Sequence, residues 1–401
     1  MLAVLHVPGF RQYAISRAAS SVANSMLQAV ILWQVYAISG STLSLGIVGL
    51  VGFVSTLLSS LIGGVVVDAY DRRVVLFSSQ TVPGLGSLAM LAAIATDHVS
   101  LELIYGVVLV TGLASSFESP ARQAILPAIV PRRLYTRAMT TNSALSSVTS
   151  VSGPALGGLL IALGGVAQAY AAHAALVALA LVALVPLHVP AVKAAGRVQL
   201  SAIQEGLAFV WKRKELLGAM TLDMFAVLFG GAKALLPVYA INVLHANAVG
   251  YGILSASLEA GTLLMALVLI VIRPPTHAGR ILLISVAAFG LATVLFGVSR
   301  SLPLSVAAYA LVGMADQVSM IMRQNTIQLN TPDALRGRVS AVESVFISAS
   351  NELGALESGM VATLTSAVFA VVSGGVACVI VVAIVAWRIP ALRRYRMPTT
   401  P

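Results

Sequence analysis

Residues 122–137 read RQAILPAIVPRRLYTR, and residues 323–338 read RQNTIQLNTPDALRGR. The two stretches lie 201 residues apart in a chain of 401 residues, and they align without a gap. Identical residues at this offset include eight pairs: Arg122 and Arg323, Gln123 and Gln324, Pro131 and Pro332, Leu134 and Leu335, Arg137 and Arg338, Ser143 and Ser344, Gly153 and Gly354, and Gly158 and Gly359. Because the offset is half the chain length, the sequence indicates two related halves in tandem.

The composition excludes a water-soluble globule. Hydrophobic residues make up 58% of the chain and charged residues only 9%, whereas soluble proteins carry about 25% charged residues. Lipid must therefore cover most of the exterior. The same figures exclude intrinsic disorder, which needs low hydrophobicity and high charge. Since Cys378 is the single cysteine, an internal disulfide and a multi-cysteine metal site are also excluded.

The apolar residues gather in stretches long enough to cross a bilayer, which takes about 20 residues. Twelve stretches qualify: 13–38, 42–67, 74–96, 100–118, 138–163, 167–188, 216–243, 249–272, 279–298, 302–329, 338–364 and 367–389. Six fall in each half. The sequence therefore predicts an all-α membrane protein with twelve transmembrane helices, divided into an N-terminal bundle (1–188), a linker (189–215) and a C-terminal bundle (216–401).

The basic residues fix the expected orientation. Of the 24 Lys and Arg residues, all but Lys233 and Arg300 fall on one side of this twelve-helix arrangement. By the positive-inside rule that side is the cytoplasm, and an even number of helices leaves both termini there. The net charge of +10 thus reflects cytoplasmic loops, and we expect no nucleic-acid partner.

The linker over 189–215 is the only long connection. Ile203, Leu207 and Val210 share one helical face, and Lys212 to Lys214 follow it. This pattern favours a helix lying in the cytoplasmic interface. A simple run-in to the seventh span is the alternative.

Two parallel six-helix repeats describe the architecture of the major facilitator superfamily. The loop after the second span reads GVVVDAYDRR over 64–73, and it resembles the loop signature of that superfamily, G-x-x-x-D-x-x-G-R-R. Ala69 and Asp71 depart from the signature. The resemblance implies that Gly64, Asp68, Arg72 and Arg73 govern conformational switching. The alternative, a plain cytoplasmic loop, explains the arginines but not the Gly/Asp spacing.

The fifth span carries Gly153-Pro154-Ala155-Leu156-Gly157-Gly158. Proline kinks a helix, and small residues let a neighbouring helix approach closely. The stretch resembles the G-P-x-x-G-G signature of major facilitator antiporters, although Thr149 stands where the longer form has glycine. The resemblance implies outward transport and a conformational role for Gly153, Pro154, Gly157 and Gly158. A membrane helix that merely tolerates glycine and proline is the alternative.

The wider pattern is similar to one branch of the superfamily. Residues 119–127, SPARQAILP, and residues 331–339, TPDALRGRV, resemble the siderophore and drug exporters of the enterobactin-exporter branch. This implies proton-driven efflux and leaves the cargo open. The arginine that many drug antiporters carry on the fourth helix is missing, because residues 103–117 hold no charge.

Charged residues within spans are costly and point to function. Glu259, Asp316 and Glu352 each lie roughly 20 Å from the cytoplasmic helix end at 1.5 Å per residue. Three carboxyls at one level in a low dielectric should not all ionise, because burial and mutual repulsion disfavour the charges. We therefore expect Asp316 and Glu352, and then Glu259, to couple transport to protons. A buried polar network that only fixes helix packing is the alternative.

Other polar residues in the spans suggest gating or substrate binding. Asp223, Arg323 and Glu343 form a layer nearer the cytoplasm, which we interpret as a structural or gating ion pair. Lys233 and Glu357 lie slightly beyond the middle and are placed to pair in the substrate cavity. The remaining candidates are Asn24, Gln28 and Trp33 for the cavity, and Glu118 for a gate near Arg72 or Arg122. Trp33 could equally belong to the interfacial aromatic belt.

No nucleotide-binding G-x-x-x-x-G-K, zinc-protease H-E-x-x-H or hydrolase G-x-S-x-G occurs in the sequence, and the histidines are isolated. We therefore expect no enzyme activity, no cofactor and no metal. The leading hypothesis is a monomeric exporter in a bacterial inner membrane that exchanges protons for a siderophore or amphipathic drug. Uptake or facilitated diffusion, and a transport-inactive receptor or scaffold, are the alternatives.

Overall fold

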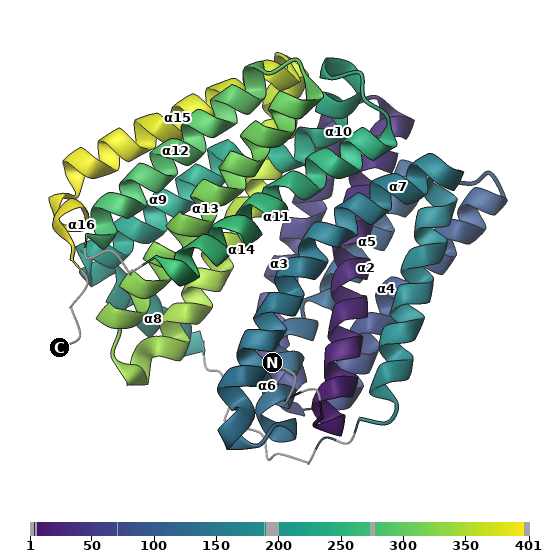
Figure 1. Cartoon of the computed structure of the whole chain (residues 1–401), viewed down its shortest axis with the longest axis horizontal. Helices are drawn as coiled ribbons and strands as arrows, with labels where there is room; N and C mark the ends of the chain where they lie inside the picture. The colour runs from purple at the N-terminus through teal and green to yellow at the C-terminus, as the bar shows by residue number, and fades with distance from the viewer. Residues whose placement is uncertain are drawn as a thin grey trace. The chain divides into compact units, whose positions relative to one another are not determined.

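The computed structural model describes residues 4, 6–69, 71–187, 189, 200–272 and 277–396. Every long element in these ranges is helical (Figure 1). The elements are α2 (Pro8–Ser39), α3 (Thr42–Ala69), α4 (Arg72–Ala95), α5 (Leu101–Ser115), α6 (Glu118–Ile129), η1 (Arg132–Leu134), α7 (Tyr135–Leu184), α8 (Leu200–Lys212), α9 (Lys214–Gly230), η2 (Ala232–Leu235), α10 (Leu236–Val238), η3 (Tyr239–Val243), α11 (Ala248–Val271), α12 (Ala278–Val298), α13 (Leu302–Asn330), α14 (Asp333–Leu364), α15 (Ala367–Arg388) and α16 (Pro390–Arg394).

In the described part of the chain, ten helical segments are long and apolar enough to cross a membrane. One of them, Arg132–Leu184, is 53 residues long, and its backbone leaves the helical region at Gly164 and Gly165. Gly165 has a φ of +75°, which suits glycine because a side chain would clash there. The 32-residue α14 is not among the ten, since its acidic and basic residues lower its hydropathy.

The fourth candidate span is longer than the sequence predicts. It runs over Leu101–Ile129, whereas the apolar stretch ends at residue 118. Helices α5 and α6 make up this span and are separated by a short turn at Ser116 and Phe117. The segment 103–117 is uncharged, but the span itself carries Glu118 and Arg122. The prediction stopped short because the polar residues of α6 lower the local hydropathy.

The linker contains a separate helix. Helix α8 ends at Lys212, Arg213 has extended backbone, and α9 begins at Lys214. Val210 is buried in a small apolar core with Leu216, Met220 and residues of α13 and α14. Helix α8 is thus separated from α9 at Arg213. Residues 190–199 of the predicted linker and the side chain of Ile203 lie outside the described residues.

The helices form two compact units. The first comprises Met1–Gly40, Val51–Val198 and Asn247–Ala256, and the second comprises Ser41–Leu50, Gln199–Ala246 and Ser257–Pro401. The core of the first unit lies between α2, α4, α6 and α7, with Phe10, Tyr13 and Leu76 among its buried side chains. Each unit also contains the first part of a helix from the other half of the sequence, α11 in the first unit and α3 in the second.

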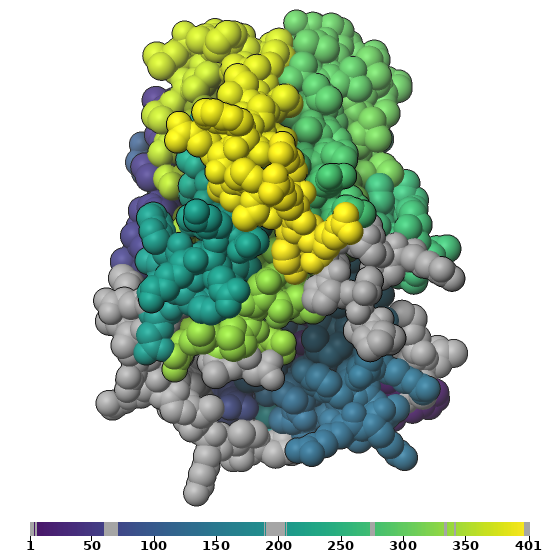
Figure 2. All heavy atoms as spheres, turned by 90° about the vertical axis from the view of Figure 1, so that its left-hand side faces the viewer, coloured from purple at the N-terminus to yellow at the C-terminus, as the bar shows by residue number. Residues whose placement is uncertain are grey.

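Helix α15 of the second unit has an exposed apolar face. It lies at the surface in Figure 2, where it is yellow. Its exposed large side chains are Phe369, Val376, Ile380, Ile384 and Trp387. Their spacing of three, four and seven residues places them on one face of the helix. An exposed apolar stripe of this kind fits lipid rather than water.

Candidate transport and gating residues

Glu118 lies at the centre of a buried polar cluster in the first unit. Its Oε1 accepts hydrogen bonds from Arg122 Nε at 2.7 Å and Ser20 Oγ at 3.0 Å, with Gln80 Nε2 at 3.5 Å. Its Oε2 accepts a hydrogen bond from Asn24 at 3.2 Å. We call these five residues, together with Arg17, the Glu118 cluster. Helices α2, α4 and α6 supply its members.

The two arginines of the cluster differ in their surroundings. Arg122, whose side chain is 3% exposed, also donates to Ser20 Oγ at 2.8 Å and lies 5.6 Å from the Tyr13 ring. Arg17 is 25% exposed, lies 4.0 Å from Glu118 Oε1, and donates to Ser146 Oγ at 3.4 Å. The two guanidiniums are close enough to repel each other electrostatically. Glu118 thus compensates Arg122 directly and Arg17 only weakly.

The three residues of the first span that are predicted to line a cavity lie in different environments. Asn24 belongs to the Glu118 cluster. Gln28, one turn later, is exposed. Trp33 packs on Tyr251 of α11 with ring centroids 5.1 Å apart, and the Tyr251 hydroxyl donates to the Ala29 carbonyl at 2.8 Å. Trp33 therefore contributes to packing between α2 and the first part of α11.

The arginines after α3 bind main-chain carbonyls in the first unit. Arg72 donates to the Ala124 carbonyl at 3.4 Å, and Arg73 donates to the Val185 carbonyl at 2.5 Å. Asp71, which departs from the superfamily signature, accepts a hydrogen bond from the Arg73 N–H at 2.8 Å and so caps α4. Such a cap stabilises a helix start. The other two motif positions, Gly64 and Asp68, lie outside the residues whose side chains the structure describes.

The glycine and proline motif of α7 contacts two helices of the first unit. A Cβ on Gly153 would lie 2.5 Å from Ser25 Cβ of α2, and one on Gly157 would lie 3.2 Å from Met26. On Gly158 it would lie 2.5 Å from the Cα of Gly252 in α11. Pro154 lies within α7, and a Cβ on Gly252 would lie 3.0 Å from its carbonyl oxygen. The small residues thus allow backbones to approach where side chains could not.

The second unit contains an ion cluster around Arg323, which the 201-residue offset relates to Arg122. Arg323 of α13 forms an ion pair with Asp223 of α9, and its Nε lies 3.4 Å from Glu343 Oε1 of α14. The side chains of the three are 5%, 9% and 12% exposed. The structure therefore brings together the three residues that the sequence placed at one depth. We call them the Arg323 cluster.

The carboxyls predicted for proton coupling are all in the second unit. Asp316 of α13 and Glu259 of α11 are close enough to interact electrostatically. Their helices approach closely, because a Cβ on Gly313 would meet the Leu258 carbonyl, and Thr262 Oγ1 donates to the Gly313 carbonyl at 3.2 Å. Asp316 and Glu259 are both partly exposed.

Glu352 has a different partner. It interacts electrostatically with Lys233 of η2, and it is also partly exposed. The sequence placed Lys233 with Glu357 instead. The Glu357 carboxylate accepts a hydrogen bond from Ser358 Oγ at 3.4 Å. Glu352 lies five residues before Glu357 on α14, and the pairing of Lys233 with Glu357 stays a prediction.

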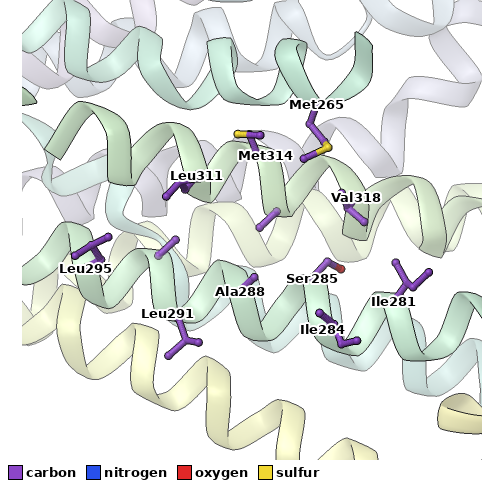
Figure 3. A pocket seen from close by; sticks show the side chains of 12 residues that line it. Met265, Ile281, Ile284, Ser285, Ala288, Leu291, Leu295, Leu311, Met314 and Val318 are labelled. Carbon is purple, nitrogen blue, oxygen red and sulfur yellow. The ribbon is translucent and has the colours of Figure 1, made fainter. Parts of the chain in front are cut away.

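An apolar pocket of about 530 Å³ lies between α11, α12 and α13 in the second unit. Figure 3 shows Met265 and Met314 facing a row of α12 side chains that includes Ile281, Ser285 and Leu295. None of the predicted site residues lines this pocket. Ile284 and Leu291 on its rim are largely exposed, so the pocket is suited to apolar chains rather than to charged groups.

Sequence reasoning placed Glu118 near Arg122 but did not place Arg122 inside a span or give Arg17 a role. The repeat indicates that Arg122 lies within a span, because Arg122 occupies the position of Arg323, which falls in the predicted span 302–329. For metals, the described residues contain no group of three or more His, Cys, Asp or Glu side chains arranged to hold an ion.

The chain is similar to known transporters over nearly its whole length. A family model described as transmembrane secretion effector matches residues 1–398. The enterobactin exporter EntS of Citrobacter koseri is 27% identical over 396 residues, covering 98% of this chain and 94% of the relative. The enterobactin exporter EntS of Escherichia coli O1:K1 is 26% identical over 393 residues, covering 97% and 94%.

Solved structures share the fold. The nucleoside transporter NupG has a TM-score of 0.71 at 15% identity, covering 96% of this chain and 99% of NupG. A POT family transporter in complex with 5-aminolevulinic acid has a TM-score of 0.75 at 11% identity, covering 96% of each chain. These likenesses confirm the predicted all-helical major facilitator fold.

Proposed function

Because the chain belongs to the transmembrane secretion effector family of major facilitator transporters, we propose that it exports a siderophore or an amphipathic drug-like molecule by proton antiport. The enterobactin exporters among its relatives support export as the direction and a siderophore as one cargo class. The glycine and proline motif of α7 supports the same direction.

The proposal of proton coupling rests on the proximity of Glu259 and Asp316 on two adjoining helices. Two carboxylates close together in a low dielectric repel each other when both are charged. Acidic residues within membrane helices are costly and commonly mark proton relays. Glu352, beside Lys233, is the second carboxyl we assign to coupling. Substrate exchange then follows when protonation changes the charge of this region.

The transporter architecture supports further proposals. We take the spans to number twelve, with α7 supplying two and α14 one, and the N-terminal and C-terminal bundles to cover 1–188 and 216–401. Basic residues in the connections favour cytoplasmic termini and a cytoplasmic linker over 189–215. Transport proceeds by alternating access in the membrane of a bacterial cell, with the chain acting as a monomer.

The test uses everted membrane vesicles with an acid interior and measures uptake of enterobactin and of ethidium. We expect Asp316→Asn and Glu352→Gln each to lower the initial rate of gradient-driven uptake by about tenfold or more, since each removes a titratable group from the relay. Glu102→Gln, a change to an exposed acid at the start of α5, is the matched control and should leave the rate unchanged.

Wild-type rates in both variants, normalised to the amount of folded protein, would contradict proton coupling through these carboxyls. Uptake of both probes into right-side-out vesicles, with none into everted ones, would show that the transporter works in the import direction.

A further inference from the structure

The Glu118 cluster carries one positive charge more than its single carboxylate can neutralise. Among the side chains that the structure describes there, Arg17 and Arg122 carry two guanidiniums, and Glu118 supplies one carboxylate. The remaining members, Ser20, Asn24 and Gln80, are neutral. Leaving a charge unpaired away from water is costly, so the cluster is suited to receiving an anion.

The Glu118 cluster also contains N–H donors that have no hydrogen-bond partner. Arg122 Nη1 and Arg17 Nε are buried and have no hydrogen-bond partner. Arg122 is 3% exposed, whereas Arg17 is 25% exposed, so an approaching ligand reaches Arg17 first. A guanidinium matches the geometry of a carboxylate and can bind it through two parallel hydrogen bonds.

The repeat-related cluster in the second unit is balanced differently. Arg323 has two carboxylates, Asp223 and Glu343, for one guanidinium. At the offset of 201 residues, Arg17 corresponds to Gly218 and Glu343 corresponds to Asn142. The surplus of positive charge in the first unit is therefore a property of this half of the chain and not of the shared fold.

We propose that the Glu118 cluster binds the carboxylate of an organic anion, with Arg17 as the accessible cation and Arg122 behind it. Glu118 limits the affinity, because it competes with the ligand for both guanidiniums and repels its charge. This inference rests on the proposed transport function, to which it adds the charge class of the cargo. The anion is released when the Glu118 carboxylate displaces it from the two guanidiniums.

The test measures equilibrium binding of radiolabelled benzoate, and of its neutral amide benzamide, to the full chain in lipid nanodiscs without a pH gradient. Empty nanodiscs provide the blank. We expect benzoate to bind saturably and about tenfold or more tighter than benzamide, which corresponds to about 1.4 kcal/mol. Arg17→Gln should weaken benzoate binding by about tenfold and leave benzamide unaffected. Arg11→Gln, a change to an exposed arginine on the same helix, is the control and should change neither.

A second variant separates binding from misfolding. Glu118→Gln removes the competing charge but keeps an oxygen that accepts a hydrogen bond from Arg122, so benzoate affinity should rise severalfold. A damaged fold would lower it. Equal affinity for benzoate and benzamide, unchanged benzoate binding in Arg17→Gln, or an unchanged or lower affinity in Glu118→Gln protein whose unfolding transition matches that of the wild type would overturn the proposal.

The two proposals fail in distinguishable ways, because this binding needs no proton gradient. Benzoate selectivity through Arg17, together with gradient-independent transport in the vesicle assay, would leave the anion site standing and remove proton antiport. Gradient-driven efflux without benzoate selectivity would do the reverse.

Discussion

Replacing Arg323 with methionine is expected to lower the free energy of unfolding by about 3–5 kcal/mol. The change leaves the buried Asp223 and the largely buried Glu343 without their cation. A methionine fills a similar volume, so the loss reports on charge rather than on a cavity. Unfolding in mixed detergent micelles, followed by intrinsic fluorescence, measures the difference.

The equivalent change in the first unit, Arg122→Met, provides the matched comparison. We expect it to cost less, about 1–3 kcal/mol, because Glu118 keeps Arg17 and the neutral donors of Ser20 and Asn24. The difference between the two variants therefore measures the charge balance of the clusters. Equal losses, or a wild-type stability for Arg323→Met, would contradict this account.

A rescue experiment completes the comparison. Adding Asp223→Asn and Glu343→Gln to Arg323→Met removes the two uncompensated carboxylates, and part of the lost stability should return. Breaking a buried ion pair is costly mainly because one charge stays behind, whereas removing both charges often costs little. A triple variant no more stable than Arg323→Met would locate the loss in packing instead.

The membrane helices could be predicted because a strong and simple signal specifies them. Apolar residues over a bilayer thickness predict a spanning helix irrespective of tertiary contacts. The break at Gly164 and Gly165 follows from local backbone preference in the same way. The fourth span was underestimated because buried polar contacts, which sequence does not display, compensate Glu118 and Arg122.

The depth of a charged residue within the membrane could be estimated from the sequence. The direction of its side chain around the helix axis could not. Counting residues from the helix ends gave similar depths to Asp223, Arg323 and Glu343, which the structure pairs. The same count gave Lys233 and Glu357 similar depths, and the predicted pairing rests on that alone. Glu352 and Glu357 are five residues apart, which separates them by about 140° around α14. The neighbours of that helix decide which one meets Lys233.

Alanine at Gly158 or at Gly359 is expected to lower the free energy of unfolding by about 2–3 kcal/mol, as overpacking does in well-packed interiors. A Cβ on Gly158 would lie 2.5 Å from the Gly252 Cα and the Ala248 carbonyl oxygen, within the first unit. A Cβ on Gly359 would lie 2.7 Å from the Gly46 Cα and 2.8 Å from the Thr42 carbonyl, within the second unit. The obstacle is backbone in both cases, so it cannot yield by a change of rotamer.

The control for these variants is Gly106→Ala in α5, where an added Cβ meets nothing within 4 Å. Alanine favours a helix over glycine by about 1 kcal/mol, so this substitution should be neutral or stabilising. The same chemical change thus has opposite expected signs at Gly106 and at the other two positions, and unfolding in mixed micelles measures all three. Stabilisation at Gly158 or Gly359 would mean that the helices can separate there without loss, and that close backbone contact contributes nothing to holding them together.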